Sequence, residues 1–356
     1  MSHLTQWLSL VFSVIAVLVL EATMHSFIRS LFGSIFGKTF SSLYKAAEQG
    51  DANAQCDLGF MFEMGQGVPQ DNQQAAIWYR KAAEQGNADA QSNLGAMYAQ
   101  GRGVPQDDQQ AVAWYRKAVE QGNAITQCNL GAMYYDGKGV EQDYAQAMAW
   151  FRKAAEQGDA DAQYNLALMY YNGEGVPQDN QQAVAWYSQA ARQRNAAAQY
   201  ALALMYANGE GVPQDNQLAL TWYRQAAGQG NAAAQCKLGE MNEMGQGVRL
   251  DYAQAVAWYR KAAEQGHADA QTSLGSMYAH GLGVPQDDQQ AVAWYRKAAE
   301  QGNASAQCNL GVMYEKGRGV PQNNQQAVAW YSQAARQGHA GAQHQLGSLY
   351  AQGLGV

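Results

Sequence analysis

The first residues to consider for covalent chemistry are Ser42 and Lys45, which form a Ser-x-x-Lys match. In β-lactamases and penicillin-binding proteins this spacing supplies a serine nucleophile and a lysine, together with Ser-Asp-Asn and Lys-Thr-Gly motifs. Here Lys38-Thr39 is followed by Phe40, and no Ser-Asp-Asn occurs. Two fixed positions in four match easily by chance, so the sequence predicts no catalytic residue and no enzyme.

Metal and cofactor chemistry is also poorly represented. The six histidines are scattered, and His339 and His344, five residues apart, have no evident third ligand. Repeated Gly-x-Gly-Val stretches resemble phosphate-binding loops only superficially, because each follows a predicted helix and none ends in Gly-Lys-Ser/Thr. We therefore expect neither a metal nor a cofactor, and no small-molecule substrate.

The composition describes a packed protein. It is 47% hydrophobic and 15% charged, with a formal net charge of −7. This acidic balance offers no basic surface for the phosphate backbone, so we expect no nucleic-acid partner.

The residues that recur most regularly are tryptophans. A Trp-Tyr or Trp-Phe pair recurs every 36 residues without insertion, with Trp at 78, 114, 150, 186, 222, 258, 294 and 330. A fixed period of this length indicates a repeat architecture, in which each unit contacts only its neighbours. The chemistry, if any, must therefore be built on a repeated scaffold.

One period contains the signals for two helices. Asn87 is a suitable N-cap, Ala88–Gln100 has apolar residues at helical spacing, and Gly101 can adopt positive φ at the end. Asp107 is predicted to cap a second helix, with Gln110 completing a capping box. We call these helix A and helix B. The recurring Trp, Tyr, Leu and Met are predicted to form the core between them.

One unit departs from the pattern where helix B ends. Arg194 replaces the glycine found there in the other repeats. A non-glycine residue at this point must adopt a strained left-handed conformation, or the turn must change.

This motif resembles the Sel-1-like repeat, a relative of the tetratricopeptide repeat. The resemblance covers about residues 39–356, as roughly eight full repeats and an incomplete last one. In the second repeat its residues are Ala90, Leu94, Gly95, Met97, Tyr98, Gly101, Gly103, Val104, Asp107, Ala111, Trp114, Tyr115, Lys117, Ala118, Glu120 and Gly122. The resemblance implies an all-α fold, a right-handed α-solenoid of antiparallel helix pairs, whose members act as non-enzymatic scaffolds or adaptors.

The four cysteines do not fit the cysteine-rich branch of that family, which staples each repeat with a pair. Cys56, Cys128, Cys236 and Cys308 are separated by 72, 108 and 72 residues, so no two occupy neighbouring repeats. With helix pairs about 10 Å apart, the nearest two are about 20 Å apart, whereas a disulfide needs about 7 Å. We predict free, weakly reactive thiols.

Comparison of the repeats with one another identifies a variable face. Counting from the aromatic residue after each Trp, positions 11, 14, 15, 18, 21 and 22 of helix A change freely, while the other helix A positions hardly change. At about 100° per residue, the variable positions occupy one contiguous third of the helix. This face is either merely solvated or the lining of a partner-binding groove.

The residue types favour the groove. The fourth and fifth repeats collect tyrosine and leucine on this face, as interfaces do. The flanking repeats carry Phe60, Met64 and Met244, or polar residues (Glu240, His280, Lys316 and His344). An extended peptide or a partner helix would suit such a groove. The predicted partner-binding residues are Tyr135, Tyr164, Leu168, Tyr171, Tyr200 and Leu204.

Residues 1–38 form a separate hydrophobic segment. Residues 7–20 are apolar and uncharged, shorter than a typical membrane span and closer to a signal-peptide core. The region before them has no Lys or Arg and the cleavage site is poor, while residues 27–36 resemble a membrane-surface helix. We expect an exported or membrane-anchored, envelope-associated protein, although Arg29 and Lys38 would favour the opposite orientation.

The sequence therefore predicts a non-enzymatic adaptor that binds proteins or peptides along helix A and contacts the membrane through its N-terminus. One alternative is a cell-envelope hydrolase or β-lactam-binding protein, which would need a nucleophile that the repeats do not display. Another is a secreted effector that uses the same groove on host proteins.

Overall fold

The structure is a computed structural model, and it describes residues 40–354. This part of the chain contains helices and no strand. A helix over residues 40–48 comes first. The others are α2 (Ala52–Met64), α3 (Asn72–Glu84), α4 (Ala88–Gln100), α5 (Asp108–Val119), α6 (Ala124–Asp136), α7 (Tyr144–Glu156), α8 (Ala160–Asn172), α9 (Asn180–Arg192), α10 (Ala196–Asn208), α11 (Asn216–Gly228), α12 (Ala232–Met244), α13 (Tyr252–Glu264), α14 (Ala268–His280), α15 (Asp288–Glu300), α16 (Ala304–Lys316), α17 (Asn324–Arg336) and α18 (Ala340–Ala351).

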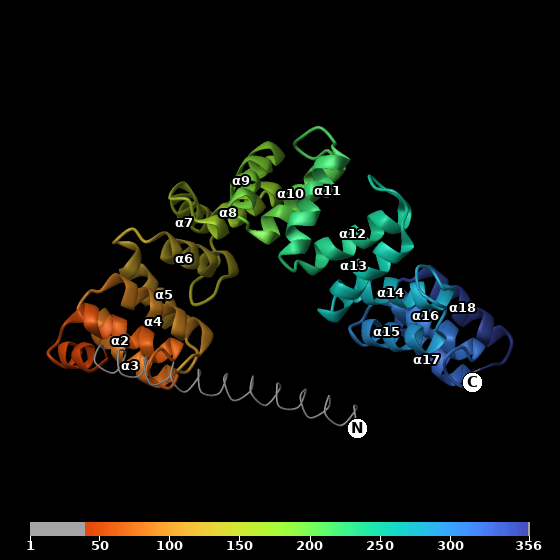
Figure 1. Cartoon of the computed structure of the whole chain (residues 1–356), viewed down its shortest axis with the longest axis horizontal. Coiled ribbons are helices and arrows are strands. Elements are labelled where there is room, and N and C mark those ends of the chain that lie inside the picture. Colours follow the sequence, from red (N-terminus) through yellow and green to blue (C-terminus); the bar gives the residue numbers. More distant parts are fainter. Residues whose placement is uncertain (1–39, 355–356) are drawn as a thin grey trace, which may run out of the picture. The chain divides into compact units, whose positions relative to one another are not determined.

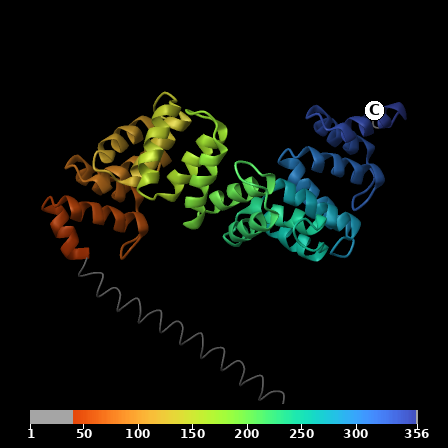
Figure 2. The ribbon, with the colours of Figure 1, turned by 90° about the horizontal axis from the view of Figure 1, so that it is seen from above.

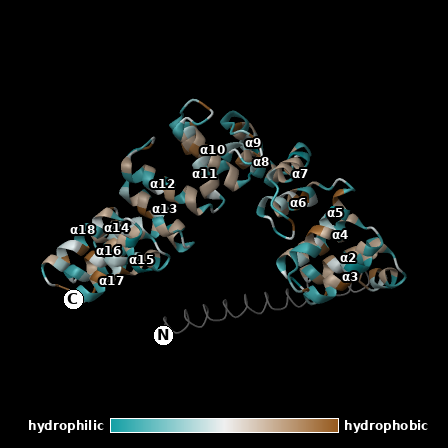
Figure 3. Cartoon of the chain, turned by 180° about the vertical axis from the view of Figure 1, so that it is seen from behind, coloured by the Kyte–Doolittle hydropathy of each residue, from teal (hydrophilic) through white to brown (hydrophobic). Residues whose placement is uncertain are grey.

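The chain divides into two compact units, one ending at Asp159 and the other beginning at Ala160. Within each unit, helices that follow one another in sequence lie side by side as antiparallel hairpins (Figures 1 and 2). Even-numbered helices are helix A and odd-numbered helices are helix B of successive repeats. The predicted all-α solenoid of helix pairs is thus confirmed, and Figure 3 shows apolar residues in stripes along the helices.

The caps explain why the helices begin and end where they do. The side chain of Asn87 accepts a hydrogen bond from the Ala90 amide at 2.8 Å, and Gly101 ends α4 with φ of 66°. Asp107 caps α5 through the Gln110 amide. The predicted capping box is incomplete, because the Asp107 amide donates to the Tyr98 carbonyl at 3.0 Å instead of to the Gln110 side chain.

The core differs in one respect from the prediction. Leu94 and Met97 are fully buried, and so is Tyr79, the aromatic residue that follows Trp. The tryptophans themselves are mostly only half-buried, as Trp114 is, and Lys117 places its Nζ 4.0 Å from that ring centroid. The tyrosine of the pair therefore fills the core, while the tryptophan covers its edge beneath a lysine.

A glutamine ladder joins neighbouring repeats. In its fullest form, Gln265 donates through Nε2 to Oε1 of Gln235 at 2.7 Å, and Gln235 donates through Nε2 to the Ala227 carbonyl at 3.1 Å. These bonds satisfy both ends of a buried amide and tie a helix B terminus to the preceding hairpin. The ladder was not predicted, because the constant glutamine of helix A was noted only as a position that hardly changes between repeats.

The glycine replacement predicted to cause strain does so. Arg194 has φ of 67° and is the one non-glycine residue of the described chain with positive φ. In the next repeat Gly230 occupies the same turn with φ of 91°. The turn is thus kept and the backbone takes the strain.

Substitution Arg194→Gly should stabilise the second unit by about 1 kcal/mol, because glycine adopts this conformation without the steric cost. Urea denaturation followed by circular dichroism at 222 nm should show a higher midpoint. The reciprocal control Gly230→Arg should lower it. Equal midpoints for Arg194→Gly and the original chain would contradict the assigned strain.

Candidate functional site

Five of the six predicted binding residues meet in the second unit. Tyr164, Leu168 and Tyr171 on α8 and Tyr200 and Leu204 on α10 line one cavity of about 370 Å³. All five side chains are half-buried. The successive helix A elements therefore place their variable faces side by side, and we call this space the tyrosine cavity.

The sixth predicted residue lies elsewhere. Tyr135 belongs to α6 in the first unit, where its ring packs edge-on against Tyr144 with centroids 5.4 Å apart. It does not line the tyrosine cavity.

Six lining residues of this cavity were not predicted, and Tyr187 and Glu210 among them add an aromatic ring and a charge. Tyr187 of α9 is buried, and its ring centroid lies 5.6 Å from that of Tyr164. It follows Trp186, and because this position is Tyr or Phe in every repeat we expected it in the core. Glu210 lies in the loop after α10, outside the helical face that was compared.

The helix B tyrosine lines this cavity in a repeat where the contact between helix A and that tyrosine has changed. In the second repeat, a Cβ added to Gly95 would lie 2.8 Å from the Tyr115 ring. In the fourth repeat Ala167 stands at that position, so the ring of Tyr187 cannot take the same place. The same comparison holds for Ala203 and Tyr223 in the fifth repeat. These two tyrosines line the cavities described here.

Glu210 supplies the charge of the tyrosine cavity. The Tyr171 hydroxyl donates to its Oε2 at 3.0 Å, and Asn208 donates through Nδ2 to its Oε1 at 2.9 Å. The hydrogen bond to Glu210 raises the pKa of Tyr171. The carboxylate is thus oriented from two sides by neutral donors.

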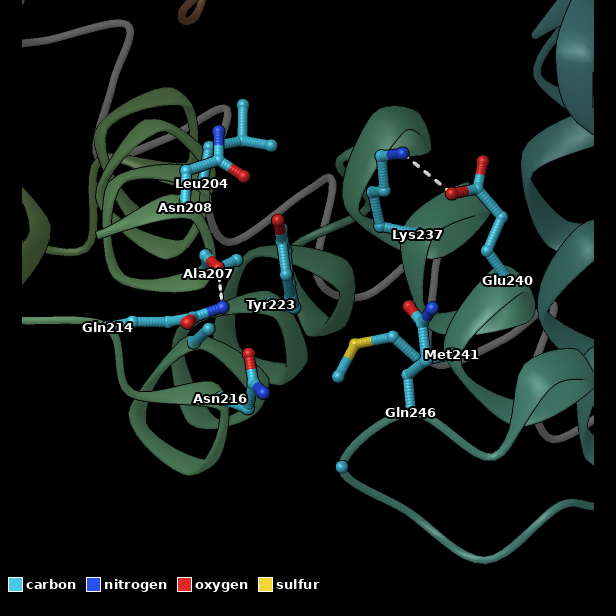
Figure 4. A pocket seen from close by; sticks show the side chains of 12 residues that line it. Leu204, Ala207, Asn208, Gln214, Asn216, Tyr223, Lys237, Glu240, Met241 and Gln246 are labelled. Carbon is cyan, nitrogen blue, oxygen red and sulfur yellow. Dashed lines mark hydrogen bonds and ion pairs between the residues drawn. The ribbon is translucent and has the colours of Figure 1, made fainter. Parts of the chain in front are cut away.

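A second cavity of about 400 Å³ adjoins the first and shares Leu204 with it. Figure 4 shows Leu204 and Asn208 of α10 on one side, Lys237 and Met241 of α12 on the other, and Tyr223 between. Lys237 forms a 2.6 Å ion pair with Glu240, which raises the pKa of Lys237. We call the two cavities together the groove.

Several of the other variable positions are exposed to solvent. The exposed side chains predicted on this face include Phe60, Met64 and Met244, and also His280, Lys316 and His344.

The cysteines correct one part of that prediction. None of the four forms a disulfide, as predicted, but Cys128, Cys236 and Cys308 are buried and Cys56 is half-buried. Position 14 therefore does not open onto the groove where it carries cysteine. Cys236, for example, packs into the same core cluster as Tyr259 of the next helix. Burial raises the pKa of the Cys56 and Cys236 thiols to about 12.

The remaining chemical candidates gain no support. Ser42 and Lys45 are exposed on the helix over residues 40–48 and line neither cavity. Among residues 40–354, no group of three or more His, Cys, Asp or Glu is arranged to hold a metal ion. In the same range no helix has the length and apolarity of a membrane span. The predicted anchor at residues 7–20 lies outside the described residues.

Comparison with known proteins agrees with the repeat boundaries. The Sel1 repeat model matches nine consecutive segments: 52–87, 88–123, 124–159, 160–195, 196–231, 232–267, 268–303, 304–339 and 340–356. The chain belongs to the Sel1 repeat family. Sel1-repeat solenoids typically serve as non-enzymatic protein–protein interaction scaffolds, so the fold indicates protein partners.

Two solved Sel1-repeat structures are similar over most of this chain. One is c5321, described as a protective antigen of uropathogenic Escherichia coli, with 42% identity over 88% of this chain and 67% of that chain and a TM-score of 0.75. The other is a Sel1 repeat protein from Oxalobacter formigenes, with 38% identity over 89% and 93% and a TM-score of 0.64. A sequence comparison with curated proteins finds no match.

The buried thiols and tyrosines make a prediction about alkaline pH. Burial raises the pKa of Cys56, Cys236, Tyr115 and Tyr295 to about 12. In the unfolded chain these thiols lose their protons near pH 8.5 and the tyrosines near pH 10, at roughly their ordinary values. The folded chain keeps those protons, so the stability that they contribute is complete below about pH 8.5 and falls as pH rises toward 12.

Urea midpoints should therefore be level between pH 7 and 8 and decline steadily from pH 9 to 11. The double variant Cys56→Ser/Cys236→Ser should show a weaker decline below pH 10, where only the thiols titrate. A flat profile in the original chain would show that these groups are not protected in the fold.

Proposed function

We propose that this Sel1-repeat protein is an adaptor that holds an extended segment of a partner protein in the groove of its second unit. The observation that carries the proposal is the convergence of Tyr164, Leu168, Tyr171, Tyr200 and Leu204 on one cavity. These residues vary between repeats, whereas most of the positions that build the scaffold do not. The groove thus differs from the rest of the array mainly in its lining.

The lining has the properties of a protein interface. Tyrosine offers a large apolar area with few rotatable bonds, together with a hydroxyl group for hydrogen bonding. Tyr164 and Tyr200 are each fixed by a ring contact with a tyrosine of helix B, at 5.6 and 5.9 Å between centroids. Such preorganised side chains lose little entropy when a partner binds.

The same lining gives little support to catalysis. The residues of the two cavities include no serine, cysteine or histidine. Their tyrosines are poor nucleophiles, because burial raises the pKa of Tyr164, Tyr200 and Tyr223. The lining residues therefore suit the binding of a partner better than they suit hydrolysis.

A pull-down with the full chain as bait tests the proposal. Partners captured by the original chain should be lost with Tyr171→Ala/Leu204→Ala, because both side chains line the cavity and their loss removes contact area. The matched control Tyr278→Ala changes a half-buried tyrosine of α14 that bonds Arg260 and does not line the groove. It should retain the partners. Circular dichroism must show that all variants remain helical.

Retention of every partner by the groove variant would move the binding site elsewhere on the array. Capture of no partner by the original chain would leave the variable face as solvated surface.

The proposed place of action is the cell envelope, with residues 1–38 delivering or holding the array there. The description of the similar Escherichia coli protein as a protective antigen supports export. In fractionated cells, the full chain should be found with the envelope and a chain lacking residues 1–38 should be found in the cytosol. The same distribution for both chains would refute the role of this segment.

A further inference from the structure

Position 24 of each repeat lies in the loop after helix A, and in the second, fifth and eighth repeats its side chain contacts the preceding repeat. It carries a cation in the second, third and eighth repeats (Arg102, Lys138 and Arg318) but glutamate in the fourth and fifth (Glu174 and Glu210). In the first unit, Arg102 at this position pairs with Glu63 of the preceding repeat at 2.9 Å. The equivalent contact in the second unit joins Glu210 to Tyr171.

The pair in the second unit therefore lacks the cation of the first pair and contains a carboxylate instead. Glu63 and Tyr171 occupy the same position of their repeats, and both contacts span 39 residues. The first pair is therefore neutral as a whole, whereas the second carries the charge of Glu210. Within residues 40–354, Glu210 forms no ion pair.

The neighbouring groups do not neutralise this charge. Tyr171 and Asn208 each donate one hydrogen bond to a different oxygen of Glu210, and a carboxylate offers about four acceptor sites. Both oxygens thus keep the capacity for a further donor. Lys237, the cation of the adjoining cavity, is already held by Glu240 at 2.6 Å.

The rest of the tyrosine cavity suits a flat cation. Four tyrosines line it (Tyr164, Tyr171, Tyr187 and Tyr200), together with the single carboxylate of Glu210. Aromatic rings attract cations, and more strongly where water is partly excluded. Guanidinium combines a planar, weakly hydrated ion that stacks on rings with a fork of donors that matches a carboxylate.

We propose that the tyrosine cavity binds an arginine side chain of the partner segment. The guanidinium donates to the two oxygens of Glu210 and packs among the tyrosine rings, while Leu168 and Leu204 contact apolar groups beside it. This inference rests on the proposed function, since it names the residue by which the partner is recognised. A neutral apolar anchor and a lysine are the competing occupants.

The test uses the full chain and three small probes in saturation-transfer difference NMR titrations: N-acetylarginine amide, N-acetylcitrulline amide and N-acetyllysine amide. Citrulline keeps the shape of arginine without its charge. The arginine probe should bind about ten-fold more tightly than the citrulline probe, as expected for a charge-assisted pair at a partly buried site. It should also bind more tightly than the lysine probe, and weaken with added salt.

Two variants locate the effect. Glu210→Gln should weaken binding of the arginine probe about ten-fold and abolish its preference over citrulline. Glu300→Gln makes the same charge change on an exposed residue at the end of α15, away from the groove, and should leave both affinities unchanged. Circular dichroism must show equal helicity.

Equal affinity for arginine and citrulline, tighter binding of lysine, no binding of the arginine probe, or no effect of Glu210→Gln would each overturn the inference. These results are separable from failure of the proposed function. A partner whose capture depends on Tyr171 and Leu204 but not on Glu210 would retain the groove and exclude arginine as its anchor.

Discussion

The close approach of helix A to an aromatic ring of helix B is the contact on which most of the repeats depend. A Cβ added to Gly239 would lie 2.5 Å from the Tyr259 ring, so the glycine lets the ring approach the helix closely. Tyr259 is fully buried, and its hydroxyl donates to Glu243 at 2.6 Å. The fourth and fifth repeats carry Ala167 and Ala203 instead, and the groove opens beside these two repeats.

Coupling between repeats comes from the glutamine ladder rather than from apolar contact alone. The glutamine ladder is interrupted at one point, between Gln91 and Gln121. Gln91 keeps its bond to the Ala83 carbonyl, but its Oε1 is buried without a partner, and Gln121 donates to the Gly86 carbonyl instead. The interruption coincides with Val119, which stands where Ala299 occurs in an otherwise intact copy, and with α5 ending one residue early. The ladder is thus interrupted at the turn where the side chains differ from those of the intact copy.

The groove is therefore a local modification of a uniform scaffold. Its walls come from variable positions of α8 and α10, from the helix B tyrosine Tyr187, and from the loop carboxylate of Glu210. The adjoining cavity adds the Lys237–Glu240 pair, which balances its own charge. Since caps and ladder fix the helices, these side chains are oriented before any partner arrives, and a partner need order only itself.

The sequence by itself determined most of the scaffold. The 36-residue period, the caps at Asn87 and Gly101, the strained Arg194 and the free cysteines were all predictable, because each follows from local chemistry repeated at a fixed spacing. The variable face was predictable from helical geometry, and five of its six proposed residues converge.

Only the tertiary structure decided which side chains share a cavity. Tyr187 was not predicted because its position is aromatic in every repeat, and Glu210 was not predicted because it lies in a loop. Tyr135 was included because the phase of a helix does not reveal its contact with Tyr144. Burial of the cysteines and the failed capping box have the same origin. Each depends on which other helix supplies the contact, and the period of a single helix does not contain that information.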